Sequence, residues 1–432
     1  MARAQLKEQR QAAAADRVAD LSLPEGGAWA SEARAAARDR MLEMGLPTKR
    51  DEYWKWTDPS SLTSGEVPRA ALFDPREQSI FHGVDRLKVV FVDGVFDPEA
   101  SDPLEMAGVE IERLSDVAAT DIHWARDLYG VLEARGHMPV ERPLAAFNTA
   151  YATDGVVIRV TGRAEKPVSL LYLHKSESSD AILHHLVKVE EGAELTILEN
   201  GPAAARFSKG MEVEVADGAT FRHIRTQGRD HERRASTACF ARLGKESTFQ
   251  SFTMTVNGVL TRNEVVIELT GDDSVAHVAG AALGDGSDFH HDDTVFITHD
   301  AVNCESRQVF KKVLRNGATG VFQGKILVKA GAQKTDGYQI SQSLLLDDDA
   351  QFLAKPELEI YADDVACSHG STSGAIDEDA LFYLRSRGVP EKEATNLLTL
   401  AFLAEALDEI HDADLAERLR GRLSDWLERH SY

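Results

Sequence analysis

The pattern of apolar and polar residues changes twice along the chain and divides it into three parts. Residues 1–145 are rich in Ala, Glu and Arg, and apolar residues recur at helical spacing, as in AWASEARAAARDRMLEMG and again around Leu104. This periodicity predicts a mostly helical N-terminal domain over 1–145. Within it, DEYWKWTD holds Tyr53, Trp54 and Trp56. We interpret these rings as an anchor that ties the helical part to the next layer.

Residues 146–375 instead show short stretches of alternating apolar and polar positions, such as DGVVIRV, VSLLYLH and GKILVKAG. This alternation is typical of strands. The turns between the strands resemble one another, because EGAELTI is followed by DGATFRHI, 26 residues later when counted from Gly192 to Gly218. Looser copies begin at Lys245, Asp272, Asn316, Ala330 and Asp348.

A repeated strand unit cannot bury its apolar face alone, so it stacks on copies of itself. The repeats therefore predict a β-solenoid over residues 146–375, and a β-sandwich is the structural alternative. No helical pattern interrupts residues 151–365. This continuity disfavours α/β folds that need helical crossovers.

Residues 376–432 return to a helical pattern. Asp377 is placed to cap a first helix, Gly388 to end it, and Pro390 to open a second. In the second helix we expect one broad apolar face, formed by Leu397, Leu398, Phe402 and Leu407.

Such an apolar face either packs on the end of the solenoid or binds a partner, and both can hold. Large apolar patches rarely stay bare on soluble proteins. We therefore assign partner docking to this C-terminal helical domain, with the candidate residues Phe382, Leu397, Leu398 and Phe402.

Composition narrows the classes of partner. The formal net charge of −23 argues against nucleic acid and anionic membranes, which repel an acidic surface. No apolar run approaches the roughly 18 residues of a membrane span, and the Ala-rich start of the chain predicts an amphipathic helix and no secretory signal. The three cysteines are far apart, which fits a reducing compartment. We expect a cytoplasmic protein.

The usual enzyme motifs do not occur. GVFQGKI, over residues 320–326, is one residue short of the phosphate loop GxxxxGK and lacks the following Ser or Thr. There is also no GxSxG, HExxH or GxGxxG arrangement. The chain is therefore not expected to hydrolyse ATP itself.

The segment DFHHDDTVFITHD is rich in metal-ligand side chains. In a strand, residues two apart share a face, so His291 and Asp293 could converge while His290 points away. Imidazole and carboxylate ligands suit a divalent transition metal. Half-exposed polar positions of an ordinary strand give the same pattern, so a metal site and a purely structural strand both remain as interpretations.

The segment ADDVACSHGSTSG places Cys367 and His369 on one face of a strand, with Ser368 on the other. A thiolate and an imidazole form half of a soft metal site, whose other ligands must come from elsewhere. The alternative is a buried Cys that acts as a small apolar residue near a structural His. A Cys–His nucleophile is less favoured, because the sequence offers no orienting third group.

The same region resembles a known family. GKILVKAGAQKTDGYQISQ, DDVACSHG and LFYLRSRG are similar to the SufB/SufD family of iron–sulfur cluster assembly proteins, and DDVACSHG resembles its SufD branch. The resemblance is strongest over residues 307–410 and extends loosely to YWKWTD. Ala366 stands where many relatives carry Lys, which removes one charge beside the motif.

The resemblance implies a right-handed parallel β-helix core between helical terminal domains. It implies a non-catalytic scaffold subunit of the SUF system that pairs with SufB and binds the ATPase SufC through its C-terminal helices. It is also compatible with a homodimer when the chain is isolated. Cys367 and His369 would lie at the SufB interface, where a transient iron–sulfur cluster forms. No iron–sulfur cluster would stay tightly bound to the isolated chain. Cys239 and Cys304 are interpreted as core residues of the β-helix.

Two other classes of protein compete with this interpretation. One is a β-helix enzyme that acts on polysaccharides, although such enzymes are usually secreted. The other is a free-standing metal-binding protein, which would hold iron in the isolated chain.

Overall fold

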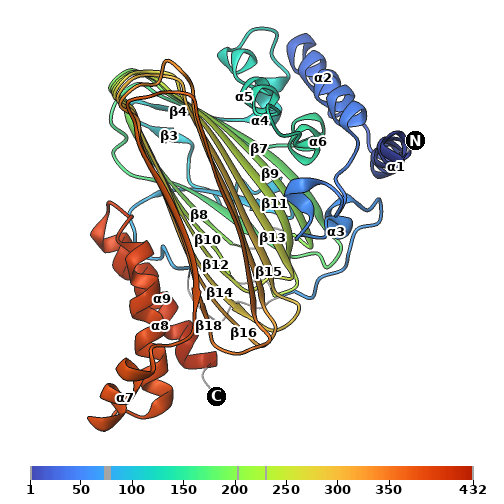
Figure 1. Ribbon diagram of the computed structural model, residues 1–432. Helices are drawn as coiled ribbons and strands as arrows, with labels where there is room; N and C mark the ends of the chain where they lie inside the picture. Colours follow the sequence, from blue (N-terminus) through green and yellow to red (C-terminus); the bar gives the residue numbers. More distant parts are fainter. Residues whose placement is uncertain (1, 73–78, 202–203, 229–230, 431–432) are drawn as a thin grey trace.

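In the part of the chain that the structure describes, two facing ten-stranded sheets form the centre of the molecule. The computed structural model describes residues 2–72, 79–201, 204–228 and 231–430 (Figure 1). From β5 onward the chain alternates between the sheets, and from β6 onward each strand pairs in parallel with the strand one coil earlier. This arrangement confirms the parallel β-helix and excludes the β-sandwich alternative.

We call the two sheets A and B. Sheet A contains β1 (Leu87–Val92), β2 (Val95–Phe96), β6 (Val168–Leu173), β8 (Glu194–Asn200), β10 (Thr220–Gln227), β12 (Thr248–Val256), β14 (Val275–Asp285), β16 (Glu305–Arg315), β18 (Asp336–Leu345) and β20 (Ala366–Gly374). Sheet B contains β3 (Glu105–Met106), β4 (Val109–Arg113), β5 (Val156–Val160), β7 (Asp180–Val189), β9 (Arg206–Val215), β11 (Arg234–Leu243), β13 (Leu260–Leu269), β15 (His290–His299), β17 (Thr319–Val328) and β19 (Gln351–Ile360).

The repeat seen in the sequence is one coil of this β-helix. Glu194 of β8 lies beside Thr220 of β10, 26 residues later, which is the spacing of the first two turns. Equivalent side chains stack between coils, as Phe221 and Phe249 do with ring centroids 5.4 Å apart. Alternate residues of both sheets therefore point inward and form one apolar core.

The irregular spacing of the repeats has a structural cause. Turns from sheet B to sheet A form one column, in which the N–H of Gly192 donates to the carbonyl of Asp217 in the next coil. The copies that begin at Asn316 and Asp348 belong to a second column, which leads from sheet A to sheet B. No single repeat length describes all the copies, because they belong to two different columns of turns.

The N-terminal part covers the outer face of sheet B (Figure 1). Its helices are α1 (Ala2–Arg17), α2 (Ala28–Met44), η1 (Glu52–Trp54), α3 (Ser60–Thr63), α4 (Leu114–Ala118), η2 (Trp124–Asp127), α5 (Val131–Arg135) and α6 (Pro143–Tyr151). The aromatic anchor is confirmed, because the Trp54 ring lies 4.0 Å from the Arg262 guanidinium and Tyr53 contacts Phe296 with ring centroids 5.1 Å apart.

The helical prediction is wrong for residues 87–113, including the segment around Leu104. These residues form β1 to β4, which extend both sheets at the first coil. The apolar residues that resembled a helix instead cover the start of the core, where Val89 and Phe91 are buried. The sheet edge supplies hydrogen-bond partners that a sequence pattern does not reveal.

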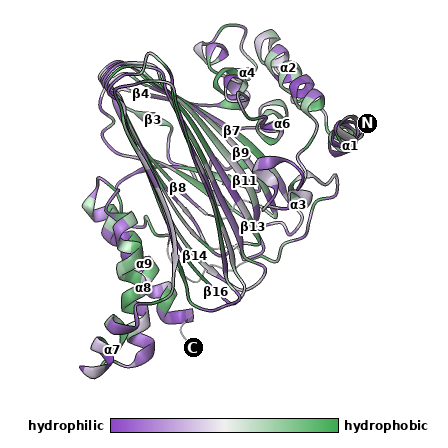
Figure 2. Cartoon of the chain, in the orientation of Figure 1, coloured by the Kyte–Doolittle hydropathy of each residue, from purple (hydrophilic) through white to green (hydrophobic). Residues whose placement is uncertain are grey.

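The C-terminal helices α7 (Glu378–Ser386), α8 (Glu391–Leu407) and α9 (Ala413–His430) follow β20. Asp377 caps α7 as expected, since its carboxylate accepts from the backbone N–H groups of Asp379 and Ala380. Helices α8 and α9 lie on the outer face of sheet A, and Figure 2 shows their hydrophobic residues beside that sheet. Leu403 and Leu407 are fully buried there.

The predicted single apolar face of α8 is wrong. Leu407 belongs to the buried face, whereas Leu397 is 47% exposed. Phe402 packs against the same cluster as Leu407, with its ring centroid 4.5 Å from the ammonium of Lys311 in sheet A. Five residues advance about 140° around a helix, so Leu397 does not share the side of α8 on which Phe402 meets sheet A.

Candidate functional site

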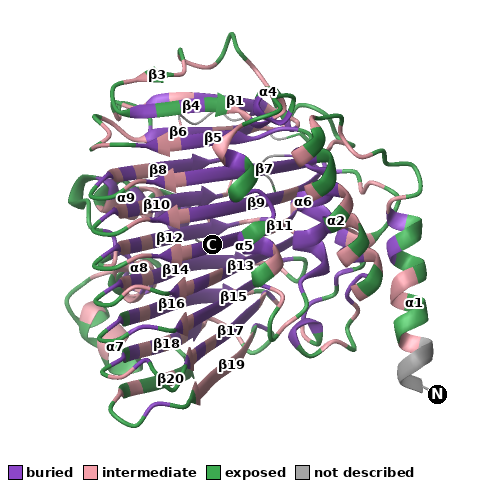
Figure 3. Cartoon of the chain, turned by 90° about the horizontal axis from the view of Figure 1, so that it is seen from above, coloured by how far each residue is buried: buried purple, intermediate pink, exposed green. Residues whose placement is uncertain are grey.

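The last coil leaves one end of the β-helix open. Within the described residues, β20 pairs only with β18 and β19 pairs only with β17, so each has an edge without a neighbouring strand. Figure 3 shows that both strands are mostly intermediate or exposed, in contrast to the buried strands of the middle coils. An unpaired edge of this kind can accept a further strand.

Cys367 and His369 lie on this last coil, on the inner face of β20. They pair in register with Gly337 and Gln339 of β18. The next inward position of β20 is Ser371, whose hydroxyl accepts a hydrogen bond from the buried Ser341 hydroxyl at 3.1 Å. Cys367 is half-buried and packs against the core, whereas the imidazole of His369 is exposed. The two side chains therefore share a face at the open end.

These two residues do not form a complete metal site. Burial raises the pKa of the Cys367 thiol, which keeps it protonated near neutral pH. Across the part of the chain that the structure describes, no group of three or more His, Cys, Asp or Glu side chains could hold a metal ion. One thiol and one imidazole fit iron only if further ligands arrive from outside the chain.

The histidine–aspartate group of β15 is divided between the two faces of sheet B. His291 and Asp293 converge inside, as predicted, with Nδ1 and Oδ2 3.6 Å apart. The ammonium of Lys312 lies 2.8 Å from Asp293 and 3.0 Å from His291, so a protein cation already occupies the place of a metal. His290 points outward and bonds to Thr57 at 3.0 Å.

The other two cysteines lie in the core, as expected. Burial raises the pKa of Cys239 to about 12. The thiol of Cys304 donates to the carbonyl of Gly271 at 3.3 Å. Both thiols are thus occupied in packing.

Comparison with known proteins identifies the family. Residues 172–402 match the model described as "SUF system FeS cluster assembly, SufBD core domain", and residues 27–170 match "SufBD protein N-terminal region". The chain belongs to the SufBD family. SufD of Escherichia coli (strain K12), an iron–sulfur cluster assembly protein, is 29% identical over 394 residues, which cover 89% of this chain and 90% of that protein.

Other SufBD-family relatives are similar to the chain. A SufBD family protein of Synechocystis sp. (strain ATCC 27184 / PCC 6803 / Kazusa) is 30% identical over 415 residues, covering 90% of this chain and 89% of that protein. SufD of Bacillus subtilis (strain 168) is 28% identical over 282 residues, covering 62% of this chain and 63% of its own length. No helix in the described parts of this SufBD-family chain is long and apolar enough to cross a membrane.

The C-terminal helices of this SufBD-family chain present part of the predicted docking surface. Phe382 on α7 is 73% exposed, and Leu397 on α8 also faces outward. Leu398 is half-buried, and Phe402 is partly covered by sheet A. A groove of about 470 Å³ between α8 and α9 has Leu397, Leu400 and Leu427 in its lining.

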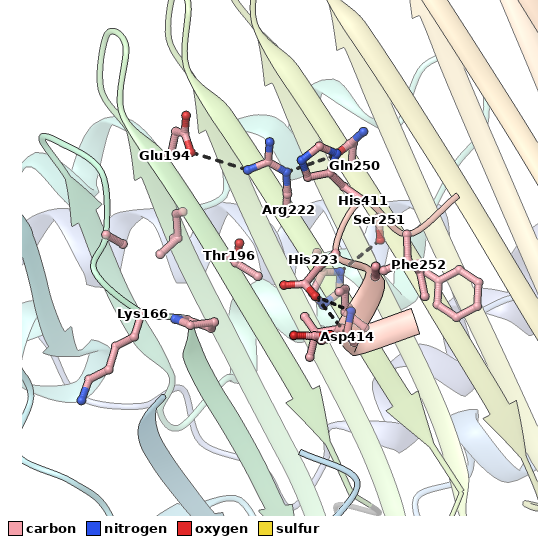
Figure 4. A pocket seen from close by; sticks show the side chains of 18 of the residues that line it. Lys166, Glu194, Thr196, Arg222, His223, Gln250, Ser251, Phe252, His411 and Asp414 are labelled. Atoms are coloured by element: carbon pink, nitrogen blue, oxygen red, sulfur yellow. Dashed lines mark hydrogen bonds and ion pairs between the residues drawn. The ribbon is translucent and has the colours of Figure 1, made fainter. Parts of the chain in front are cut away.

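A larger cavity of about 720 Å³ opens between sheet A and the loop that joins α8 to α9 (Figure 4). Arg222 crosses its floor, donating to the Gln250 side chain at 3.2 Å and lying 3.7 Å from Glu194. His411 and Asp414 line the cavity from the C-terminal part. Because both signs of charge line the cavity, it lacks the single-sign field that concentrates an ionic ligand.

A buried polar network inside the first coils was not predicted from the sequence. The Glu199 carboxylate accepts from the Lys209 ammonium at 2.7 and 2.6 Å, from the Tyr172 hydroxyl at 2.6 Å, and lies 2.7 Å from His223 Nε2. Glu199 and Lys209 occupy inward positions of alternating strands. A charged residue at an inward position was the available signal.

Proposed function

We propose that this chain is a non-catalytic scaffold subunit for iron–sulfur cluster assembly in the cytoplasm, whose open β-helix end joins a SufB-type β-helix. The observation that carries this proposal is the unpaired last coil with Cys367 and His369 on its inner face. A second β-helix that packs there covers the exposed strand edges and brings its own ligands to the same space.

The iron and sulfide of the cluster are the cargo of this site. His369 offers an imidazole nitrogen to iron, and Cys367 offers a thiolate once a cation lowers its raised pKa. The remaining ligands come from the SufB-type partner. Because neither chain completes the site alone, cluster formation requires the assembled pair, and a cluster held between two chains can be released.

We further propose that α7 and α8 dock a SufC-type ATPase. The exposed Phe382 and Leu397 support this, because both are large apolar side chains on the C-terminal helices. The absence of a phosphate loop from the sequence agrees with a nucleotide site on the partner.

The cluster site is tested by co-expressing this chain with SufB-type and SufC-type proteins and measuring iron and sulfide in the purified complex. His369→Ala should sharply lower the iron and sulfide content. It should leave assembly of the complex intact, because the variant removes only an exposed ring at the proposed interface between the two β-helices. Cys367→Ser should have the same effect if the thiol is a ligand and a smaller effect if it only lines the seam. Ser368→Ala, on the opposite face, is the matched control. Wild-type cluster content in the His369→Ala complex would refute the proposed site.

The docking surface is tested by Phe382→Asp and Leu397→Asp. Each should weaken retention of the SufC-type ATPase without changing the thermal unfolding of the isolated chain, because both side chains are exposed. Ile122→Asp is the control, since Ile122 is 84% exposed in the N-terminal part. Full retention of the ATPase by both variants would place docking elsewhere.

A further inference from the structure

Two buried glutamines stand out at the open end of the β-helix. Gln308 in β16 and Gln339 in β18 are both 0% exposed. Within the described structure, neither the oxygen nor the nitrogen of either carboxamide has a hydrogen-bond partner. Leaving a buried polar group unpaired costs about 1–3 kcal/mol. These side chains are therefore expected to meet a partner when the protein acts.

The two glutamines and His369 form one column. Gln308 pairs in register with Gln339, and Gln339 pairs in register with His369, so the three share the inner face of sheet A on successive coils. Register neighbours in a sheet lie about 4.8 Å apart. Gln339 is thus the residue directly behind His369, on the side away from the open end.

The opposite wall leaves room for the Gln339 side chain and offers it no side-chain hydrogen-bond group. A Cβ on Gly324 of β17 would lie 2.0 Å from Nε2 of Gln339, so glycine is what allows the amide to reach across the core. Gly324 pairs in register with Pro356 of β19, which has no N–H group. Within its own column, the side chains that flank Gln339 along the β-helix axis are Gln308 and His369.

We propose that Gln339 is a positioning residue for His369. Its carboxamide oxygen accepts the ring N–H of His369, and its own N–H donates to the oxygen of Gln308, which fixes the amide. This inference rests on the proposed function. A histidine that binds a metal through one nitrogen commonly donates its other ring N–H to an oxygen acceptor, which fixes its orientation and tautomer. Closure of the open end by the second β-helix presses the imidazole onto this acceptor.

The test uses Gln339→Leu, which keeps the side-chain size and removes both polar atoms. The iron content of the co-expressed complex should fall about 10-fold or more, as expected for loss of an orienting partner. The thermal unfolding temperature of the isolated chain should stay the same or rise, because an unpaired buried amide is replaced by an apolar group of similar shape. Gln342→Leu, on the outward face of the same strand, is the control and should change neither.

Two further variants separate positioning from packing. Gln339→Glu keeps an oxygen acceptor and should retain more iron than Gln339→Leu. In a His369→Ala background, Gln339→Leu should cause no further loss, because it acts only through the imidazole. An additional loss in that background, or a lower unfolding temperature, would show that Gln339 is structural and overturn the inference.

The two proposals fail in different ways. If His369→Ala lowers the iron content and Gln339→Leu does not, the positioning role is wrong and the cluster site stands. If His369→Ala leaves the iron content unchanged, the cluster site itself is wrong, and the role of Gln339 falls with it.

Discussion

Replacing Lys209 by Met should destabilise the protein more than any change to a surface ion pair. Lys209 and Glu199 face each other inside the β-helix, with side chains 2% and 0% exposed. Although burial raises the pKa of Glu199, the charge of Lys209 and the hydrogen bond with His223 hold it well below its ordinary value. The carboxylate is therefore ionised in the core, and Lys209→Met removes its principal counter-charge.

Breaking a buried pair by removing one partner costs about 3–5 kcal/mol, because a desolvated charge remains. The matched control is Lys188→Met, since Lys188 and Glu190 are about 30% exposed and 3.5 Å apart. An exposed pair of this kind contributes about 0–1 kcal/mol. The double variant Lys209→Met, Glu199→Leu should recover much of the loss, because no unpaired charge is left in the core.

The assay is urea unfolding of the isolated chain, followed by tryptophan fluorescence and circular dichroism. In the wild type, Glu199 stabilises the fold above its unfolded pKa of about 4.3, and this contribution is lost as the pH falls through the lower folded value. In Lys209→Met, burial should raise the pKa of Glu199, so its effect becomes destabilising as the pH rises. The loss should therefore be larger at about pH 8 than at about pH 5. A loss below about 1 kcal/mol, or one independent of pH, would refute the reasoning.

Three further predictions concern thiols, the aromatic anchor and backbone contacts. In the folded isolated chain, a thiol reagent should modify Cys367 alone among the three cysteines, slowly at neutral pH and faster as the pH rises, and Cys367→Ser should abolish the reaction. Arg262→Lys should lower stability by about 1–3 kcal/mol in the same unfolding assay, because a guanidinium that stacks on Trp54 and bonds to Asp292 is lost. Gly155→Ala should lower the stability by about 1–3 kcal/mol or more, since the new Cβ would lie 1.8 Å from the His184 carbonyl oxygen. Wild-type stability of Arg262→Lys or of Gly155→Ala would contradict the contacts described for that residue.

The sequence by itself determined the architecture of the core. Alternating apolar positions and similar turns were enough to predict stacked strands, because each inward side chain meets its equivalent in the next coil, as Phe221 meets Phe249. It also located the Asp377 cap and placed Cys367 and His369 on one face, since both are local properties of the backbone.

Only the tertiary structure decided which surfaces are covered and which distant residues meet. The strands at 87–113 form because a sheet edge lies beside them, and Leu397 and Leu407 differ in exposure because only one side of α8 meets sheet A. Likewise, Lys312 reaches His291 from 21 positions away. Gln339 lies behind His369 because one coil separates residues 30 apart. Such contacts depend on the length of each coil and on which surface is covered, and local periodicity does not contain either.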